Sequence, residues 1–276
     1  MANSSNRLAH LLQRFSFRSV DACVYISYDI LSNPPIAKYD FLLVSANEAL
    51  VGTRFPYFPV GGPVPPLLSS AAVGRDNRSL STMASSRWGG MDKGENMMYP
   101  VQCLDGVVHS EAGSGLLAYL QSLPEQHPFR DSAGQIVRCP VGQAVLSPSF
   151  GLSSYFSALI HTVPPFYSDE NCEAKLLSCY SNTLLLISAS GHVNSRRVIR
   201  PTTAATVLLG SGVRGIPVET AARIASRACA EFQPVVSPSG VHAKDEKDKR
   251  IDFHFILRDE DECEILIEQF SLINGR

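Results

Sequence analysis

A glycine-rich turn at residues 208–217 carries the strongest chemical signal in this sequence. It reads Leu-Leu-Gly-Ser-Gly-Val-Arg-Gly-Ile-Pro and runs from a predicted buried strand into a predicted helix. Such a turn exposes backbone N–H groups beside the positive end of a helix dipole, and both bind phosphate. The pattern matches neither the Walker sequence nor Gly-x-Gly-x-x-Gly, so a nucleoside triphosphatase or a Rossmann dehydrogenase loses support. Phosphate binding and a plain tight turn fit the local pattern equally well.

Three polar side chains stand where a strand ends or a helix begins. Asn47 follows the apolar run 40–46, and Asp105 opens a predicted helix. Asparagine at a strand end offers an amide donor and acceptor where α/β sheets usually bind ligands, but it also forms turns there. Asp105 can cap its helix, bind ribose hydroxyls or orient a water molecule. Asp29, at the end of the run 23–30, leaves a similar choice open.

The cysteines and histidines show no pattern of a metal site or a nucleophile. Seven cysteines occur without a Cys-x-x-Cys pair or zinc-type Cys/His spacing. We therefore expect reduced thiols, no metal and no cofactor. Cys103 is interpreted as structural, and His109 and His161 lie in apolar contexts typical of packed histidines.

The elements that must position these residues alternate between strands and helices. Apolar runs rich in β-branched residues predict strands covered on both faces, over 23–30, 40–46, 143–148, 158–163, 204–209 and 251–257. Helical patterns lie over 107–120, 169–187, 217–232 and 260–272. This alternation predicts an α/β fold arranged as a three-layer sandwich.

We expect one domain over residues 1–276 with irregular segments inside it. Residues 51–100 are rich in proline, glycine and serine and predict a long inserted loop. Residues 237–250 end in a mixed-charge run and predict a solvated, mobile connection. The start of the chain predicts a helix over about 7–15, with a mitochondrial presequence as the alternative.

Charge and hydropathy narrow the classes of partner. A formal net charge of −2 gives no broad basic field, so we expect neither nucleic acid nor a membrane surface as partner. No apolar run has the length of a membrane span. A small ligand or a protein partner fits better, and we expect an intracellular monomer of the cytoplasm or nucleus, or alternatively of the mitochondrion.

Taken in order, six segments resemble motifs of the macrodomain family. Tyr-Asp-Ile-Leu at 28–31 is similar to Gly-Asp-Ile-Thr, and Leu-Val-Ser-Ala-Asn-Glu at 43–48 to Val-Asn-Ala-Ala-Asn-Glu. Residues 104–113 resemble Val-Asp-Gly-Ala-Ile-His-x-x-Ala-Gly, and 139–144 resemble Cys-x-Thr-Gly-Glu-Ala. Residues 159–165 are similar to Val-Ile-His-Thr-Val-Gly-Pro, and the glycine-rich turn to Ser-Thr-Gly-Ile-Tyr-Gly-Tyr-Pro. The order of the six makes the resemblance specific.

This resemblance implies a mixed central sheet of about six strands and a site for ADP-ribose. Asp29 would bind the adenine amino group, and Asn47 and Asp105 would hold the distal ribose and position the attacking water. The other expected ligand contacts are Ile30, Gln102, Leu104, Gly210, Ser211, Gly212, Val213, Arg214 and Gly215. The Asp-Gly-x-x-His segment is most similar to MacroD-type hydrolases, which implies ADP-ribosylated acidic side chains of proteins and O-acetyl-ADP-ribose as substrates.

The sequence also departs from the family pattern. Val44 replaces the first asparagine, Val-Gln-Cys at 101–103 replaces three glycines, and Arg214 stands where an aromatic ring usually packs on the ribose. Without those glycines the backbone cannot approach the diphosphate in the same conformation. A reader that binds ADP-ribose without turnover and a phosphatase acting on ADP-ribose 1″-phosphate therefore stay open as alternatives.

Overall fold

The computed structural model describes residues 9–27, 30–31, 34–52, 91–92, 97–98, 104–126, 136–190, 201–234 and 250–275. Its centre is a seven-stranded mixed sheet in the order β1-β2-β9-β8-β3-β7-β6. The strands are β1 (His10–Ser16), β2 (Val20–Ile26), β3 (Tyr39–Ser45), β6 (Ala144–Pro148), β7 (Phe156–Thr162), β8 (Thr202–Thr206) and β9 (Ile251–Leu257). Two further short strands, β4 (Met91–Asp92) and β5 (Met97–Met98), pair only with each other.

Strand direction sets where a ligand can bind. The five inner strands pair in parallel, whereas β1 and β6 pair antiparallel at the two edges. Loops that follow the parallel strands therefore gather at one end of the sheet. In open α/β sheets that carboxyl end is where ligands usually bind.

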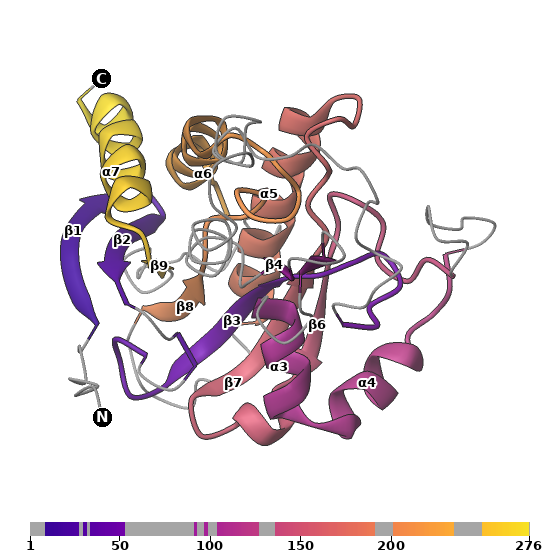
Figure 1. Cartoon of the computed structure of the whole chain (residues 1–276). Helices are drawn as coiled ribbons and strands as arrows, with labels where there is room; N and C mark the ends of the chain where they lie inside the picture. The colour runs from indigo at the N-terminus through magenta and orange to yellow at the C-terminus, as the bar shows by residue number, and fades with distance from the viewer. Residues whose placement is uncertain are drawn as a thin grey trace, which may run out of the picture.

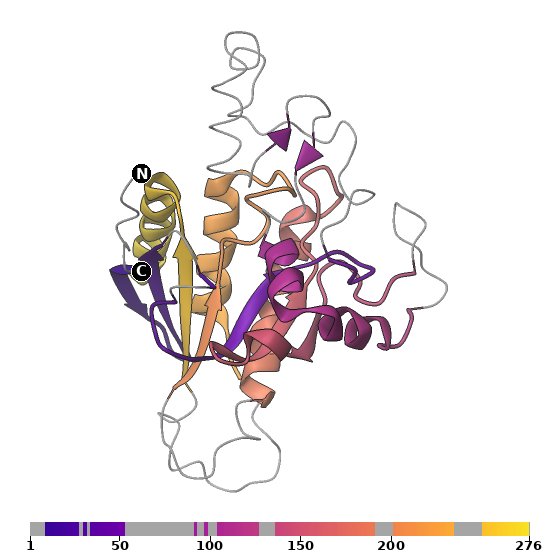
Figure 2. The same cartoon turned by 60° about the horizontal axis from the view of Figure 1, so that its bottom comes forward.

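Helices cover both faces of this sheet, as Figures 1 and 2 show. One face carries α5 (Cys172–Ser190), α6 (Val218–Glu231) and α7 (Glu260–Asn274), and the other carries α3 (Leu104–Ala112) and α4 (Ser114–Gln121). A short 3-10 helix spans Phe150–Leu152. None of the helices described combines the length and apolar character needed to cross a bilayer.

Successive side chains of the inner strands point to opposite faces of the sheet and pack into two apolar clusters, one on each face. In β3, Phe41 and Leu43 pack toward α5 and α6, while Leu42 and Val44 pack toward α3 and α4. All four residues are nearly or fully buried. A strand buried on both faces reads as a continuous apolar run, which is the pattern that the sequence shows here.

The three-layer α/β fold is confirmed, with seven strands in the sheet where about six were expected. The additional strand explains one wrong prediction, since residues 10–16 form β1 and not a helix over 7–15. Leu11, Leu12 and Phe15 have helical spacing, yet only Phe15 is buried, and the backbone pairs with β2. Tertiary pairing outweighs a local helical pattern.

The helix predicted over 107–120 is found in two pieces, and the two predicted irregular segments lie mostly outside the described residues. The helix predicted over 107–120 is broken into α3 and α4 at Gly113, whose φ of 80° lies in the left-handed region. The expected loop 237–250 lies outside the described residues except for Arg250, and most of the 51–100 insertion does too.

A buried hydrogen bond ties helix α5 to the start of the glycine-rich turn. Tyr180 is fully buried, and its hydroxyl accepts the N–H of Leu209 at 3.0 Å. Burial raises the pKa of this phenol, so the group stays protonated. The turn therefore leaves β8 from a fixed position.

Replacing Tyr180 by phenylalanine should destabilise the protein. Tyr180→Phe leaves the buried N–H of Leu209 without its acceptor, which should lower the free energy of unfolding by about 1–3 kcal/mol in urea titrations. Tyr155→Phe is the control, because Tyr155 is 39% exposed and its change should stay within about 0.5 kcal/mol. Equal stability of the two variants would contradict this role.

Falling pH should destabilise the protein through His161, a fully buried residue of β7 whose Nε2 lies 2.9 Å from Ser147 Oγ. Burial, followed by the facing His109, lowers the pKa of His161 to about 3, from its ordinary value of 6.5. The unfolded chain thus binds a proton that the folded chain excludes, and stability should decline from pH 6.5 toward 3 by roughly 1.4 kcal/mol per unit. Urea unfolding across this pH window, compared with His161→Gln, isolates the effect. Parallel declines in both proteins would assign it to other groups.

Candidate functional site

Two loops of the candidate site start from neighbouring parallel strands. β3 pairs with β8 through Phe41–Ala204 and Leu42–Ala205, so both strands end on the same edge of the sheet. The turn 46–52 follows β3, and the glycine-rich turn follows β8 and leads into α6. The topology therefore places the asparagine turn beside the expected phosphate cradle.

Glycine is required at both ends of the glycine-rich turn. Gly210 and Gly215 have φ values of 83° and 72°. A Cβ atom on Gly210 would lie 2.6 Å from a side-chain carbon of Ile216, and Ile216 N–H donates to the Gly210 carbonyl at 3.0 Å. The turn closes on itself through this hydrogen bond and a second one from Gly215 N–H to the Gly212 carbonyl at 2.9 Å.

The centre of the turn leaves backbone donors available to a ligand. Within the part of the chain described, the N–H groups of Ser211, Gly212, Val213 and Arg214 donate to no protein acceptor. A Cβ atom on Gly212 would meet nothing within 4 Å. Helix α6 begins directly afterwards, and its N-cap residue Pro217 supplies no side-chain cap. Successive free N–H groups at a helix N-terminus form an anion-binding site.

Arg214 points away from the turn and into the protein. Its Nη2 donates to the Ala46 carbonyl at 3.1 Å and lies 3.7 Å from a carboxylate oxygen of Glu48. The guanidinium carbon sits 4.3 Å from the centre of the Phe166 ring. Burial lowers the pKa of Arg214, and the charge of Glu48 opposes that shift. The side chain thus joins the glycine-rich turn to the turn that carries Asn47.

Asn47 is buried and holds its own turn. Its Nδ2 donates to the Gly52 carbonyl at 2.7 Å, and its Oδ1 accepts the N–H of Val51 at 3.3 Å. The amide still has one N–H and one lone pair for a ligand, because a side-chain amide can make four hydrogen bonds. Asn47 therefore shapes the turn whatever else it binds.

Asp105 meets the Asn47 turn through His109. Asp105 is 4% exposed in the first turn of α3, and its Oδ1 lies 3.6 Å from His109 Nε2 one helical turn later. The ring of His109 packs under Gly52, where an added Cβ atom would lie 3.0 Å from its Cγ. The residues that the sequence separates by the long insertion are thus brought to one region.

Two expected site residues lie outside the described part of the chain, and two others lie at an apolar cluster. Asp29 and Gln102 lie outside the described residues. Ile30 is buried in the apolar cluster beneath α3 and α4, and Leu104 begins α3 and packs against that cluster. The roles predicted for all these residues stay predictions.

The sequence did not predict the contacts of two residues that shape the site. Glu48 pairs with Arg214, and its backbone carbonyl accepts the N–H groups of Arg138 and Cys139. His109 faces Asp105 across 3.6 Å, and the four-residue spacing of the two on one helix was the available signal.

Solved structures share the fold. The Oceanobacillus iheyensis macrodomain with MES bound superimposes with a TM-score of 0.58 at 17% identity, covering 97% of this chain and 99% of the other. The Trypanosoma brucei macrodomain in complex with ADP gives a TM-score of 0.52 at 16% identity, covering 91% of this chain and 69% of the other. At these identities the likeness concerns the fold alone.

Sequence comparisons identify the family. A family model described as Macro domain matches residues 95–225. An O-acetyl-ADP-ribose deacetylase of Klebsiella pneumoniae is 33% identical over 137 residues, which cover 49% of this chain and 67% of the relative. A macro domain-containing protein of Xanthomonas campestris pv. campestris is 30% identical over 132 residues, which cover 47% of this chain and 64% of that protein. With the fold and these matches together, the chain belongs to the macro domain family.

Proposed function

We propose that this protein binds ADP-ribose and hydrolyses esters of its distal ribose, with the whole chain acting as one domain. The observation that carries the proposal is the run of backbone N–H groups at residues 211–214, just before the N-terminus of α6, which donate to no acceptor among the described residues. A diphosphate matches this cradle in charge and in hydrogen-bonding capacity. The relative from Klebsiella pneumoniae is named an O-acetyl-ADP-ribose deacetylase, which supports the same class of ligand.

Orientation of the ligand follows from the position of the loops. With the diphosphate on the glycine-rich turn, the distal ribose lies toward Asn47 and Asp105, because Arg214 draws those two turns together. The remaining N–H and lone pair of Asn47 bind ribose hydroxyls. At the other end of the ligand, Asp29 binds the adenine, and Ile30, Gln102 and Leu104 complete the contacts.

For an ester at the anomeric carbon, hydrolysis needs a positioned water more than an acid catalyst, because the bond from that carbon to the ester oxygen breaks and the carboxylate leaves. For an acetyl ester of a ribose hydroxyl, the same water adds to the acetyl carbonyl, and the ribose oxygen leaves and takes up the proton as acetate forms. Asp105 orients this water and withdraws its proton as the water attacks, together with a phosphate oxygen of the substrate. Positioning of this kind contributes up to roughly 7–11 kcal/mol, and a general base adds about 10²- to 10⁴-fold in rate. The substrates in this proposal are O-acetyl-ADP-ribose and proteins with mono-ADP-ribosylated acidic side chains.

One observation favours a reader without turnover as the second candidate. Asn47 already makes two of its four possible hydrogen bonds, to Gly52 and Val51. It can therefore make at most two hydrogen bonds to the ribose. Binding through the glycine-rich turn survives in that case, while positioning at the ester is lost. Measuring affinity and turnover on the same protein separates these two functions.

Filling the space above Gly212 should weaken ADP-ribose binding without unfolding the protein. Gly212→Val places a side chain where no atom of the described residues lies within 4 Å of a Cβ, so it obstructs the phosphate and not the fold. We expect affinity in isothermal titration calorimetry to fall at least about 10-fold, or about 1.4 kcal/mol. Ser211→Ala is the matched control, because the Ser211 hydroxyl already donates to the Leu208 carbonyl and the cradle uses only its backbone. Equal affinity of the Gly212 variant and wild type would remove the diphosphate from this turn.

Removing the Asp105 carboxylate should abolish most of the turnover. We expect Asp105→Ala to release acetate from O-acetyl-ADP-ribose about 10²-fold or more slowly while it still binds ADP-ribose. Glu111→Ala is the control, since Glu111 lies exposed on the same helix. Undiminished turnover by the Asp105 variant would contradict the mechanism, and binding without turnover by wild type would make the protein a reader.

The identity of the leaving group needs three substrates in parallel. Wild type should release ADP-ribose from a glutamate-modified protein and acetate from O-acetyl-ADP-ribose, and it should leave ADP-ribose 1″-phosphate largely intact. Preferential release of inorganic phosphate would instead favour the phosphatase alternative.

A further inference from the structure

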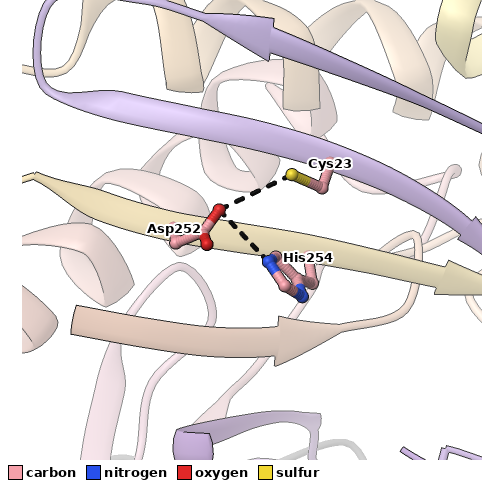
Figure 3. A group of neighbouring side chains, drawn as sticks. All are labelled: Cys23, Asp252 and His254. Carbon is pink, nitrogen blue, oxygen red and sulfur yellow. Dashed lines mark hydrogen bonds and ion pairs between the residues drawn. The ribbon is translucent and has the colours of Figure 1, made fainter. Parts of the chain in front are cut away.

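A second group of chemically capable side chains lies on the sheet and shares no residue with the candidate ADP-ribose site. Cys23 belongs to β2, and Asp252 and His254 belong to β9, on the face opposite α6 and α7 (Figure 3). The parallel register pairs Cys23 with His254, and the two-residue step in β9 puts Asp252 on the same face. One thiol, one carboxylate and one imidazole atom lie within 4.8 Å of one another.

The spacing of these atoms matches the edges of a tetrahedral metal site. Cys23 Sγ lies 3.5 Å from Asp252 Oδ1, and His254 Nε2 lies 3.1 Å from the same oxygen. Bonds of about 2.3 Å to sulfur and about 2.0–2.1 Å to nitrogen and oxygen, at tetrahedral angles, place sulfur about 3.5 Å and nitrogen about 3.3 Å from the oxygen. Two of the three edges therefore match those of a shared ion, and the third, between the sulfur and the imidazole nitrogen, is at most 4.8 Å.

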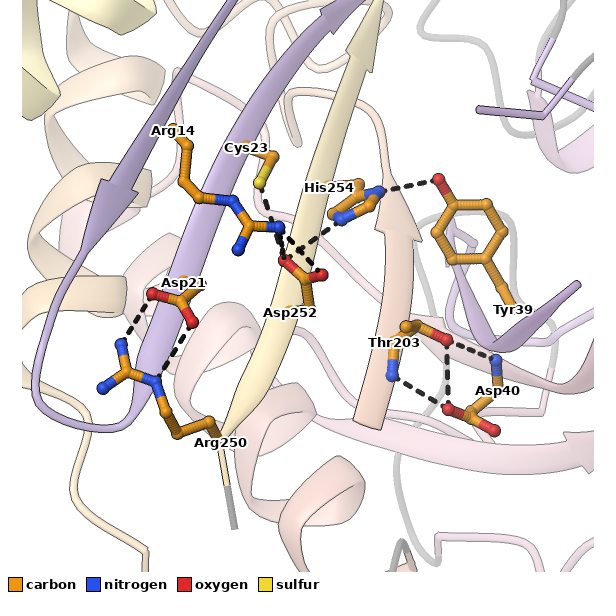
Figure 4. Close-up of polar contacts among 9 residues, drawn as sticks. All are labelled: Arg14, Asp21, Cys23, Tyr39, Asp40, Thr203, Arg250, Asp252 and His254. Carbon is orange, nitrogen blue, oxygen red and sulfur yellow. Dashed lines mark hydrogen bonds and ion pairs between the residues drawn. The ribbon is translucent and has the colours of Figure 1, made fainter. Parts of the chain in front are cut away.

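His254 is oriented in the way that metal-binding histidines are. Its Nδ1 lies 2.8 Å from the Tyr39 hydroxyl (Figure 4). The ring also contacts that of Tyr25 in a tilted arrangement, with centroids 4.9 Å apart. The residue is 1% exposed, and its Nε2 makes no hydrogen bond of acceptable geometry despite the nearby carboxylate. A histidine fixed through one nitrogen, with the other buried and aimed at a carboxylate and a thiol, has the arrangement found around bound zinc.

We propose that Cys23, Asp252 and His254 bind a divalent transition metal ion of the zinc class. This proposal is independent of the proposed ADP-ribose chemistry. Sulfur, imidazole and carboxylate ligands suit zinc and cobalt better than magnesium or calcium, which prefer oxygen alone. Three protein ligands leave a fourth position for water.

Binding balances in charge and in protons. In the metal-free protein Cys23 is a thiol, because burial, followed by the charge of Asp252, raises its pKa to about 12. The incoming ion replaces the thiol proton, which passes to solvent, and the thiolate and carboxylate then neutralise the two positive charges. The Arg14 guanidinium pairs with Asp252 at 3.2 Å, and the Arg14 side chain is 49% exposed, so it has room to turn toward solvent when an ion replaces it.

A purely structural network is the competing explanation. Arg14, Asp252, His254 and Tyr39 form a continuous polar chain in Figure 4 that stabilises the sheet without any ion. The two explanations differ at Arg14. In a purely structural network, removing Arg14 takes away a partner of Asp252 and creates no affinity for zinc. In a metal site, removing Arg14 takes away a cation that competes with the metal ion, so zinc affinity rises.

Cobalt binding by the reduced, tag-free full chain tests the proposal. We expect one Co²⁺ per chain with a thiolate-to-cobalt charge-transfer band, and displacement of that ion by one equivalent of Zn²⁺. The band should disappear in Cys23→Ala and persist in Cys229→Ala, which removes an equally buried thiol on α6. His254→Gln should also abolish it, and Tyr39→Phe should weaken zinc binding by about 10-fold.

Arg14→Gln keeps the test decisive if the Cys23 variant does not fold. Arg14 is half exposed on the edge strand, so its loss leaves the fold intact, and we expect zinc affinity to rise at least threefold in competition with a chromophoric chelator. Absence of the thiolate band in both wild type and Arg14→Gln would overturn the proposal. A band of full intensity in Cys23→Ala would overturn it equally, because the thiolate would then come from another cysteine.

Discussion

The buried guanidinium of Arg214 is the interaction on which the candidate site depends most. It starts in the glycine-rich turn after β8 and ends on the Ala46 carbonyl and the Glu48 carboxylate after β3. Pairing of β3 with β8 brings the two turns close, and the contacts of Arg214 hold them in one arrangement. A buried charge needs such partners, and removing one of them would leave the other uncompensated. The same residue that departs from the family pattern thus becomes a structural link between the two halves of the site.

Rigid support surrounds the backbone donors of the glycine-rich turn. At the start of the turn, the Tyr180 hydroxyl accepts the N–H of Leu209. At its end, the N–H of Ile216 donates to the Gly210 carbonyl. Between these points, the N–H groups of residues 211–214 donate to no acceptor within the described part of the chain. An anion-binding turn binds most tightly when its donors need no rearrangement, because little conformational entropy of the turn is then lost on binding. The fold therefore prepares the phosphate cradle before any ligand arrives.

Much of the architecture could be predicted from local pattern. Strands such as 251–257 and the amphipathic helix after Pro217 are found almost as expected, because buried apolar runs and 3.6-residue spacing are local signals. The strand at 10–16 could not be predicted, since its exposed residues Leu11 and Leu12 carry a helical spacing that only pairing with β2 overrides.

Contacts between distant segments were the part that sequence could not supply. The pairing of Arg214 with Glu48 depends on two loops meeting at the sheet edge. Cys23 and His254 lie 231 residues apart (254 − 23) and meet only through the register of β2 against β9. The sequence has no zinc-type spacing of cysteine and histidine, so no local motif could predict this cluster. Both arrangements follow from strand order, which is a property of the folded sheet.

Backbone amide resonances followed during an ADP-ribose titration would show where the diphosphate binds. We expect the largest shifts at residues 211–214 and smaller ones at Asn47 and Asp105. The amides of Gly215 and Ile216 should change little, because they already donate within the turn. Shifts concentrated elsewhere on the protein, or no shifts at saturating ligand, would contradict the assignment of the glycine-rich turn as the diphosphate site.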